Sequence, residues 1–258
     1  MRIATWNING LRARLDYVRL WLQERRPDIV ALQELKLQND QFPQAEMEEL
    51  GYHCAVHGQK AWNGVAVLSR FPFRWMQVDL PGQEDQGARL LGVETGGLKI
   101  FSVYIPNGKA VDHPDFQRKL VWLDSLAAFL RENFQPSDPL VLGGDFNVCP
   151  TGLDSWNEEE LAGTIFHTEE ERRRFRVLEE WGLVDLFRHV HPDVRAFSWW
   201  DYRAGAFPRN QGLRIDFLLA TEPVLRRVEE VGIDREWRKK KEGLTPSDHA
   251  PVWAELRD

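Results

Sequence analysis

Short apolar runs of strand type recur along this chain, and most of them end in an amide, a carboxylate or an imidazole. A short continuous apolar run favours a buried strand, and a polar side chain at the end of such a strand lies at an edge of the sheet. Because several strands end in this way, we expect distant parts of the chain to meet at one mouth. The segments are Thr5–Gly10, Leu32–Lys36, Tyr104–Gly108, Gly143–Asn147, Arg214–Phe217 and Ser247–Pro251.

The length and composition suit a single domain that spans residues 1–258. Of the 258 residues, 43% are hydrophobic, with eleven Trp and fourteen Phe, which is enough apolar surface for a large core. No stretch approaches the roughly 20 apolar residues that are needed to span a bilayer, so no membrane contact is expected. The first residues, Met1 to Ala4, enter a strand-like run at once, which leaves no room for a signal peptide.

The two cysteines, Cys54 and Cys149, do not make a disulfide framework and favour a reducing compartment, so we predict a cytoplasmic protein. The formal net charge of −7 argues against nonspecific adhesion to nucleic acid, because phosphate binding depends on clustered Lys and Arg. It does not exclude a nuclease, since a cation can offset catalytic carboxylates locally. The sequence carries no clear oligomerisation signal, so we expect a monomer.

Strand-like and helix-like segments alternate along the chain, without a flexible linker or an internal repeat. Mixed strands with covering helices predict an α/β or α+β layered sandwich. The close spacing of the strand-like segments 64–69, 88–94 and 98–104 predicts antiparallel neighbours. The long segments 150–165 and 196–213 hold little regular pattern, and loops of that length are usually functional. Further strands are predicted at 3–6, 29–33, 140–142, 215–220 and 250–256, and helices at 11–26, at 116–130 and from the capping residue Thr168 to Gly182.

Glu34 and Asp248 are candidate metal ligands. Glu34 follows an apolar run, and a carboxylate at the end of a buried strand is costly unless it is paired, solvated or bound to metal. The alternatives are a salt bridge from Glu34 to Lys36 and a turn cap made by Asp248 after Ser247. The donors on offer carry oxygen, so the ion should be Mg²⁺, with Mn²⁺ as a substitute, whereas zinc would favour Cys and clustered His. These oxygen donors are Asn7, Glu34, Asp145, Asn147 and Asp248.

Asp145 and Asn147 are separated by one residue, so their side chains would face the same way if this segment were extended. Gly143 and Gly144 would let backbone or substrate approach closely. The alternative is an Asx-type turn, in which the Asp side chain binds the backbone two residues further on.

His249 needs a partner other than its neighbour Asp248, because adjacent side chains in a strand point apart. Asp216 is the natural candidate, since a buried Asp between apolar neighbours needs a donor and a His that holds a proton needs an acceptor. A purely structural Asp–His pair is the alternative. Tyr104 ends its strand just before Pro106, which fixes a turn, so it is a further candidate site residue. The alternative is a core aromatic residue with a hydrogen-bonded hydroxyl.

Two further segments suggest contact with nucleic acid. Trp199 and Trp200 lie in the long segment 196–213, where exposed aromatic rings could stack on a base or a sugar, although ordinary core packing is the alternative. The basic run 238–241 could grip a phosphate backbone. Such a run can equally be a solvated loop.

Taken together and in this order, these segments resemble the exonuclease III family of apurinic/apyrimidinic (AP) endonucleases, within the deoxyribonuclease I-like endonuclease/exonuclease/phosphatase superfamily. The resemblance runs from Arg2 to Trp253. Its most specific parts are Trp6–Arg12, Leu32–Lys36, Tyr104–Asn107, Gly144–Asn147, Phe197–Arg203, Gly212–Asp216 and Ser247–Val252.

The resemblance implies an α/β fold, a four-layer α/β sandwich with two central mixed β-sheets flanked by helices, and an active site at one edge. It implies an Mg²⁺-dependent enzyme that acts on double-stranded DNA with abasic sites or blocked 3′ ends. The implied catalytic residues are Tyr104, Asp145, Asn147, Asp216 and His249. The implied metal-site residues are Asn7, Glu34, Asp145, Asn147, Asp248 and His249. The implied substrate-binding residues are Asn9, Lys36, Asn107, Trp199, Trp200 and Arg214.

The expected reaction is hydrolysis of the phosphodiester 5′ to an abasic site, which leaves a 3′-hydroxyl, together with 3′–5′ exonuclease and 3′-end-cleaning activity. One alternative is another phosphodiesterase or phosphatase of the same superfamily that acts on inositol phosphates, sphingomyelin or RNA tails. The other is a nucleic-acid-binding module that has lost catalysis. Both remain open from the sequence.

Overall fold

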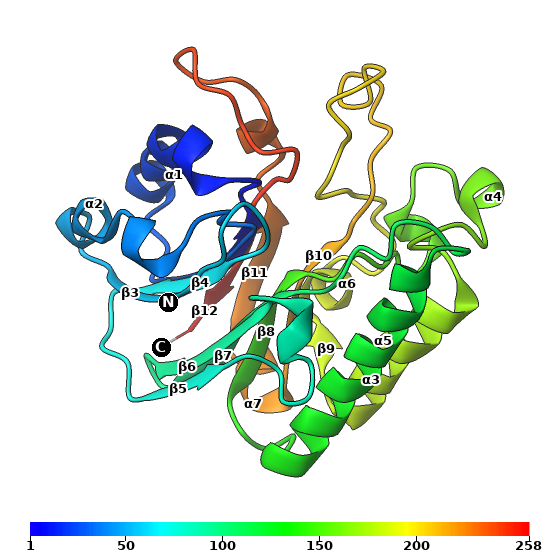
Figure 1. The fold of residues 1–258 in the computed structure, drawn as a ribbon, viewed down its shortest axis with the longest axis horizontal. Coiled ribbons are helices and arrows are strands. Elements are labelled where there is room, and N and C mark those ends of the chain that lie inside the picture. The colour runs from blue at the N-terminus through cyan, green and yellow to red at the C-terminus, as the bar shows by residue number, and fades with distance from the viewer. Residues whose placement is uncertain (258) are drawn as a thin grey trace.

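The computed structural model describes residues 1–257 and contains two six-stranded mixed sheets that pack face to face (Figure 1). In spatial order, the first sheet holds β11 (Val228–Ile233), β12 (Val252–Leu256), β1 (Arg2–Asn7), β2 (Ile29–Gln33), β4 (Val65–Ser69) and β3 (His53–His57). The second holds β5 (Trp75–Val78), β6 (Leu90–Thr95), β7 (Leu98–Tyr104), β8 (Leu140–Asp145), β10 (Asp216–Ala220) and β9 (Val184–Asp185).

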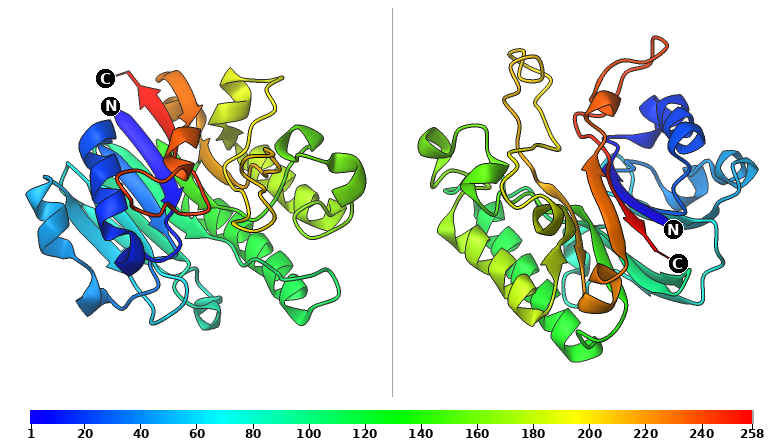
Figure 2. Two further views of the ribbon diagram at one scale, coloured as in Figure 1. Left: turned by 90° about the horizontal axis from the view of Figure 1, so that it is seen from above. Right: turned by 180° about the vertical axis from the view of Figure 1, so that it is seen from behind.

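Helices cover both outer faces, so the protein is a four-layer α/β sandwich and the predicted fold is confirmed (Figures 1 and 2). Helices α1 (Leu11–Arg25) and α2 (Gln44–Glu49) lie on the first sheet, and α3 (Pro114–Asn133) and α5 (Glu169–Trp181) lie side by side on the second. The shorter elements are α4 (Glu158–Leu161), α6 (Leu186–Val190), α7 (Glu222–Leu225), and the 3₁₀ turns η1 (Asn39–Gln41), η2 (Glu84–Gln86), η3 (Gly152–Asp154) and η4 (Arg235–Arg238).

Three apolar layers hold these elements together. Side chains such as Ile3 and Val141 fill the space between the two sheets. Trp21 of α1 packs on the first sheet, and Phe175 of α5 joins Leu142 on the outer face of the second. Each strand that is buried on both faces reads as a continuous apolar run, which is why its sequence shows little alternation.

The boundaries of the elements follow local signals. Thr168 and Glu171 form both hydrogen bonds of a capping box at the start of α5, and Gly182 ends that helix with a φ of 129°. The predicted strands and helices are confirmed, with shifts of a few residues at their ends. The sequence did not indicate α2, α6, β3, β5, β9 or β11, which are short or partly exposed and carry weaker patterns.

One predicted strand pairing is wrong. β6 and β7 are antiparallel neighbours, but β4 belongs to the other sheet, where it pairs antiparallel with β2 and β3. The segment that follows β4 crosses from one sheet to the other, so closeness in sequence does not produce pairing here.

Strand directions bring the polar strand ends to one edge of the sandwich. β1 runs parallel to β2, and β7 runs parallel to β8, so these four strands end at corresponding positions in their sheets. β10 is antiparallel to β8 and β12 is antiparallel to β1, so these strands begin where the other four end. Two loops, 200–212 in yellow and 239–247 in red, project from the same end of the molecule (Figure 1).

Cys54 and Cys149 are both free, as predicted. Within residues 1–257, no helix is both long and apolar enough to cross a bilayer.

Candidate active site

Three side chains from different elements converge at this edge. Glu34 follows β2, Asp145 ends β8, and His249 precedes β12. One ligand atom from each lies within 4.8 Å of the other two. Asn7, the last residue of β1, bridges the sheets because its Nδ2 donates to Glu34 Oε1 and to Asp145 Oδ2, both at 2.9 Å. The carboxylates are therefore held together by an amide at the end of a neighbouring strand.

His249 and Asp216 form the pair that the sequence predicts. Nδ1 of His249 lies 2.8 Å from Oδ2 of Asp216, and the same oxygen accepts a hydrogen bond from Ser198 Oγ at 2.6 Å. With Nδ1 bound to this carboxylate, Nε2 faces Asp145, 3.7 Å from its Oδ2. Asp216 pairs across the sheet with Asp145, so β8 and β10 present both acidic side chains on the same face.

Burial and neighbouring charges shift the protonation of this group. Burial raises the pKa of Asp145 to about 8, although the charge of His249 opposes this change. Burial lowers the pKa of His249, but the carboxylates of Asp216 and Asp145 outweigh it and raise that pKa to about 10. The carboxylates therefore favour the protonated imidazole, whereas burial disfavours the charged form of Asp145, an effect that a bound cation would oppose.

Tyr104 lies at the end of β7, opposite Asp145 in the parallel register. Burial and the nearby Glu34 and Asp145 raise the pKa of its hydroxyl well above the ordinary value. The sequence pattern did not indicate Arg89 as a site residue. Its guanidinium lies 4.9 Å from the centre of the Tyr104 ring and donates to the Tyr104 carbonyl. No motif marks it, because an isolated Arg before a strand is common.

Of the two conformations that the sequence allows for the segment 145–147, Asn147 does not adopt the extended one. Its φ is 49°, and its backbone N–H donates to Asp145 Oδ1 at 3.0 Å, so the segment forms the Asx-type turn. Its side chain stays at the site edge because Nδ2 donates to the carbonyl of Ile105, which follows β7. The turn therefore positions Asp145 and Asn147 together without an extended backbone.

A chain of hydrogen bonds links Glu34 to Asp248. Lys36 Nζ lies 3.1 Å from Glu34 Oε2 and donates to Asn9 Oδ1 at 2.6 Å, and Asn9 Nδ2 donates to Asp248 Oδ1 at 3.1 Å. The other oxygen of Asp248 accepts from Trp199 Nε1 at 3.0 Å. Ser247 Oγ also donates to Asp248 Oδ1, at 3.4 Å, so neutral donors hold this carboxylate. Asp248 lies beside the group formed by Glu34, Asp145 and His249 rather than within it.

The two adjacent tryptophans have different environments. Trp199 is partly exposed and packs with Leu213 beside the site. Trp200, which was predicted to bind substrate, is fully buried among Phe197, Ala206 and Ala250, so its ring is not exposed beside the site. Its indole supports the loop instead, because Nε1 donates to Asn210.

Arg214 was also predicted to bind substrate. Its guanidinium is buried, with Nε bound to Asp154 and both terminal nitrogens bound to Asp185, at distances of 2.7 to 3.0 Å. These partners occupy the guanidinium and leave it no exposed edge. It instead joins η3 and β9 beneath the site.

The basic run 238–241 is only partly solvated. Arg238 is buried, and its guanidinium donates to the carbonyls of Asp248 and Trp200. Lys239 pairs with Glu236, and Lys240 is exposed. The run therefore anchors its loop to the site through its first residue.

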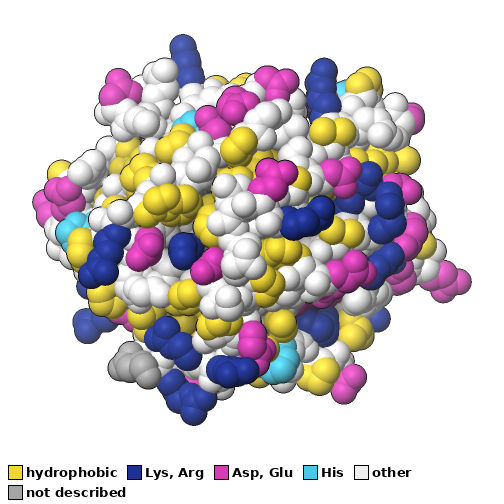
Figure 3. Space-filling model, turned by 90° about the horizontal axis from the view of Figure 1, so that it is seen from below, with side chains coloured by type: hydrophobic (Ala, Val, Ile, Leu, Met, Phe, Trp, Pro, Cys, Tyr) yellow, Lys and Arg dark blue, Asp and Glu magenta, His cyan; other side chains and the backbone are white. Residues whose placement is uncertain are grey.

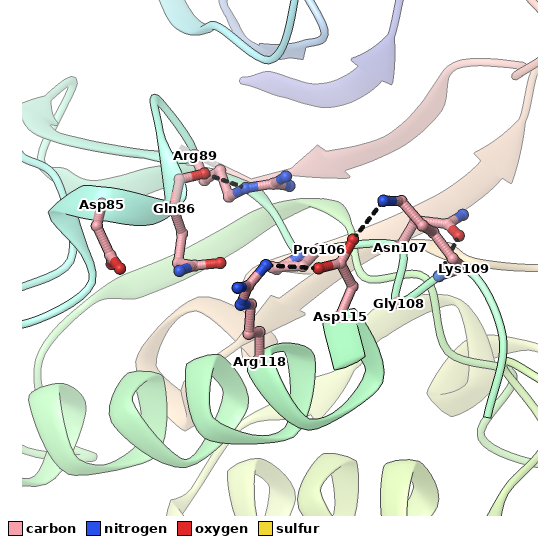
Figure 4. A pocket seen from close by; sticks show the side chains of 9 residues that line it. All are labelled: Asp85, Gln86, Arg89, Pro106, Asn107, Gly108, Lys109, Asp115 and Arg118. Atoms are coloured by element: carbon pink, nitrogen blue, oxygen red, sulfur yellow. Dashed lines mark hydrogen bonds and ion pairs between the residues drawn. The ribbon is translucent and has the colours of Figure 1, made fainter. Parts of the chain in front are cut away.

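A cavity of about 380 Å³ adjoins the site, next to Tyr104. Figure 4 shows that it lies between η2, the loop after β7 and the start of α3, with Lys109 and Arg118 both bonded to Asp115. Asn107 lines this cavity. On the face seen from below, basic and acidic side chains are interspersed (Figure 3), so that face offers no continuous basic field.

The site side chains suit a hard divalent cation. Glu34 and Asp145 supply carboxylate oxygens at close range. Asn7 holds these carboxylates together through its Nδ2, while its Oδ1 accepts from the Asn9 N–H. No Cys lies in the group. The raised pKa of Asp145 points the same way, because burial and the nearby Asp216 and Glu34 disfavour its charged form, and a bound cation would offset this.

Several known proteins resemble this chain in sequence and in fold over nearly its whole length. A sequence model described as the endonuclease/exonuclease/phosphatase family matches residues 4–249. Exodeoxyribonuclease III of Haemophilus influenzae is 35% identical over 270 residues, which cover 100% of both chains. The solved structure of the 3′ phosphatase NExo from Neisseria bound to a product DNA hairpin is 38% identical, with a TM-score of 0.94 and 99% coverage of each chain. An AP endonuclease from Archaeoglobus fulgidus is 34% identical, with the same TM-score and coverage.

Proposed function

We infer the reaction from the family, since the chain belongs to the endonuclease/exonuclease/phosphatase family and is a metal-dependent DNA-repair nuclease of exonuclease III type. We propose that it hydrolyses the phosphodiester 5′ to an abasic site in double-stranded DNA. The products are a 3′-hydroxyl and a 5′-deoxyribose phosphate. We further propose that the same site trims 3′ ends as an exonuclease and removes 3′-phosphate blocks.

One observation carries this proposal. Glu34, Asp145 and His249, with Asn7 between the two carboxylates, form a compact group at the mouth where both sheets end. Such a group combines cation-binding oxygens, a base for water and a protonated imidazole, which are the parts that phosphodiester hydrolysis needs.

The ion would be Mg²⁺, with Mn²⁺ as a substitute, held by Glu34 and Asp145, with Asn7 and Asp248 nearby. When bound, the cation neutralises phosphate charge and stabilises the leaving 3′-oxygen.

The chain's own residues supply the remaining steps. Asp145 orients the attacking water and accepts its proton as the water oxygen bonds to phosphorus and the bond to the 3′-oxygen breaks. The 3′-oxygen leaves with the bonding electron pair and takes up a proton from solvent, which gives the 3′-hydroxyl. His249 donates from Nε2 to a non-bridging phosphoryl oxygen, and Asp216 keeps that imidazole charged and correctly turned. The Tyr104 hydroxyl, which stays protonated, is a second donor. Losing one such donor costs roughly 10²–10³ in rate.

Substrate contacts surround this group. Trp199 offers a partly exposed ring, held through its indole N–H, against which a base-free sugar could pack. An abasic sugar is cheap to extrude because it has no base to unstack. Asn9 and Lys36 lie beside Glu34, and Asn107 lines the adjoining cavity together with Arg89 and Lys109, where a flanking phosphate would meet positive charge.

An end-labelled duplex series tests the proposal. The duplexes carry an abasic analogue, a recessed 3′ end or a 3′-phosphate, and each is incubated with Mg²⁺ or with EDTA. We expect incision of the abasic duplex only with Mg²⁺. Asp145→Asn should nearly abolish it while duplex binding stays within a few-fold. Cleavage of none of the three duplexes, or near-normal turnover by Asp145→Asn, would contradict the proposal.

We also propose that the protein acts as a monomer in the cytoplasm, where its free Cys54 and Cys149 would stay reduced. Sedimentation at the protein concentrations used for the activity assay should give a mass near 30.1 kDa.

A further inference from the structure

Lys119 is a buried lysine whose ammonium contacts none of the side chains that form the candidate active site. It projects from α3 toward α5, the two helices that lie side by side on the second sheet (Figure 1), and its side chain is 0% exposed. Its ammonium pairs with Glu171, which is also fully buried, and donates to the carbonyls of Asn147 at 2.5 Å and Asn107 at 3.2 Å. An ammonium has three N–H groups, so each has an acceptor.

The two carbonyls belong to the loops that carry the site. Asn147 follows β8 two residues after Asp145, and Asn107 follows β7 after Tyr104. Asn147 has the left-handed φ of 49°, a conformation that persists only where the surroundings hold it. Three contacts hold it here: Asp145 at its N–H, Ile105 at its side-chain amide and Lys119 at its carbonyl.

Glu171 anchors the far end of the same loop. Its Oε1 accepts from the backbone N–H of Phe166 at 3.1 Å, and its Oε2 accepts from Thr168 Oγ1 at 2.8 Å. Phe166, which also has a positive φ of 72°, places its ring 4.8 Å from Lys119 Nζ, and its carbonyl accepts from Cys149 N at 2.8 Å. The Lys119–Glu171 pair therefore joins both ends of the segment 147–168.

A buried ion pair by itself is a weak source of stability, because apolar side chains of similar volume often serve as well. What apolar side chains could not do is bind two backbone carbonyls. The useful property of Lys119 is therefore its set of convergent N–H groups rather than its charge.

We propose that Lys119 is a positioning residue for the phosphodiesterase site, fixing the Asn147 and Asn107 loops so that Asp145 and Asn147 keep their relative geometry. This inference rests on the proposed function. Small displacements of reacting groups lower turnover strongly, so loss of Lys119 should act on kcat rather than on substrate binding.

The test compares two variants that break the same ion pair. Lys119→Met removes the pair and both carbonyl bonds. Glu171→Gln removes the pair but leaves Lys119 in place, and burial already lowers the pKa of this lysine, so a neutral amine would still offer two N–H groups to the two carbonyls. Gln also suits the last position of a capping box. The double variant, which buries no unpaired charge, separates stability from positioning.

Steady-state kinetics are measured on the abasic duplex at a temperature where all variants are folded by circular dichroism. We expect Lys119→Met and the double variant to lose roughly tenfold or more in kcat, with KM within about twofold. Glu171→Gln should keep kcat within about twofold of wild type. The double variant should regain most of the Tm that Lys119→Met loses.

Equal loss of kcat in Lys119→Met and Glu171→Gln would overturn the proposal, because Lys119 would then be only a structural partner of Glu171. Recovery of kcat together with Tm in the double variant would overturn it as well. Wild-type protein is assayed alongside, and its failure to cleave any duplex would refute the proposed function instead.

Discussion

Replacing Arg214 with Met should destabilise the fold without removing a contact to DNA. Arg214 holds Asp154 and Asp185 with three charge-assisted hydrogen bonds, and all three side chains are buried. The variant would leave two carboxylates buried. Asp154 would keep one cation, because Arg188 also binds it, whereas Asp185 would lose its ion-pair partner.

The size of the effect follows from this arrangement. Removing one partner of a buried ion pair costs about 3–5 kcal/mol. Two acceptors lose Arg214, which favours the upper part of that range, and Arg188 offsets part of the loss at Asp154. We therefore expect Arg214→Met to lose about 4 kcal/mol of unfolding free energy. In a domain of this size that corresponds to a decrease in Tm of roughly 10 °C.

Urea unfolding followed by tryptophan fluorescence measures this change, and kinetics on the abasic duplex well below Tm measure the function. Arg203→Met is the matched control, since Arg203 is largely exposed and pairs with Asp201 in the loop 200–212, so its Tm should hardly change. KM for the duplex should stay within a few-fold in Arg214→Met. A loss of less than about 1 kcal/mol together with a tenfold increase in KM would refute the reasoning and return Arg214 to the substrate-binding set.

Three further predictions concern the site. Trp199→Phe removes the hydrogen bond to Asp248 and reduces the ring in size, whereas Trp199→Ala removes the aromatic ring altogether. The increase in KM for abasic duplex should be clearly larger for Ala, and equal values would place the sugar pocket elsewhere. In EDTA, the protonated His249 and Asp145 favour the folded state because their pKa values are raised to about 10 and about 8. The contribution of Asp145 is complete below its unfolded value of 3.8 and is lost as pH rises to about 8, and that of His249 is complete below 6.5 and is lost as pH rises to about 10. Unfolding free energy should therefore fall from about pH 4 to about pH 10 in urea titrations, and His249→Gln should flatten the upper part of that slope. Adding Mg²⁺ should raise the Tm of the wild type in a concentration-dependent way, and the same titration of Glu34→Gln should show little change if Glu34 holds the ion.

Local chemistry explains which parts of this protein could be predicted from its sequence. Continuous apolar runs identify strands buried on both faces, such as β2 and β8. The capping box at Thr168 and the Gly182 stop mark α5, because both depend only on neighbouring residues. Polar residues at strand ends likewise mark Glu34 and Asp145 as candidate site residues, since unpaired burial of a carboxylate is costly.

Contacts between distant segments decided the rest. β4 joined the first sheet although its sequence neighbours β6 and β7 form part of the second, because hydrogen-bonded pairing depends on where the chain crosses between sheets. Trp199 and Trp200 are adjacent and chemically identical, yet only the first faces the site. Arg214 lies within a motif that resembles a nuclease site, but Asp154 and Asp185, 60 and 29 residues away in sequence, occupy its guanidinium.

The sequence by itself determined which residues could do chemistry and roughly which elements carry them. Only the tertiary structure decided which of them share a surface, since burial and the choice of a charged partner depend on strand register and helix packing over long sequence separations. Lys119 shows the difference most clearly, because nothing in its local sequence indicates that three acceptors from three separate segments would surround its ammonium.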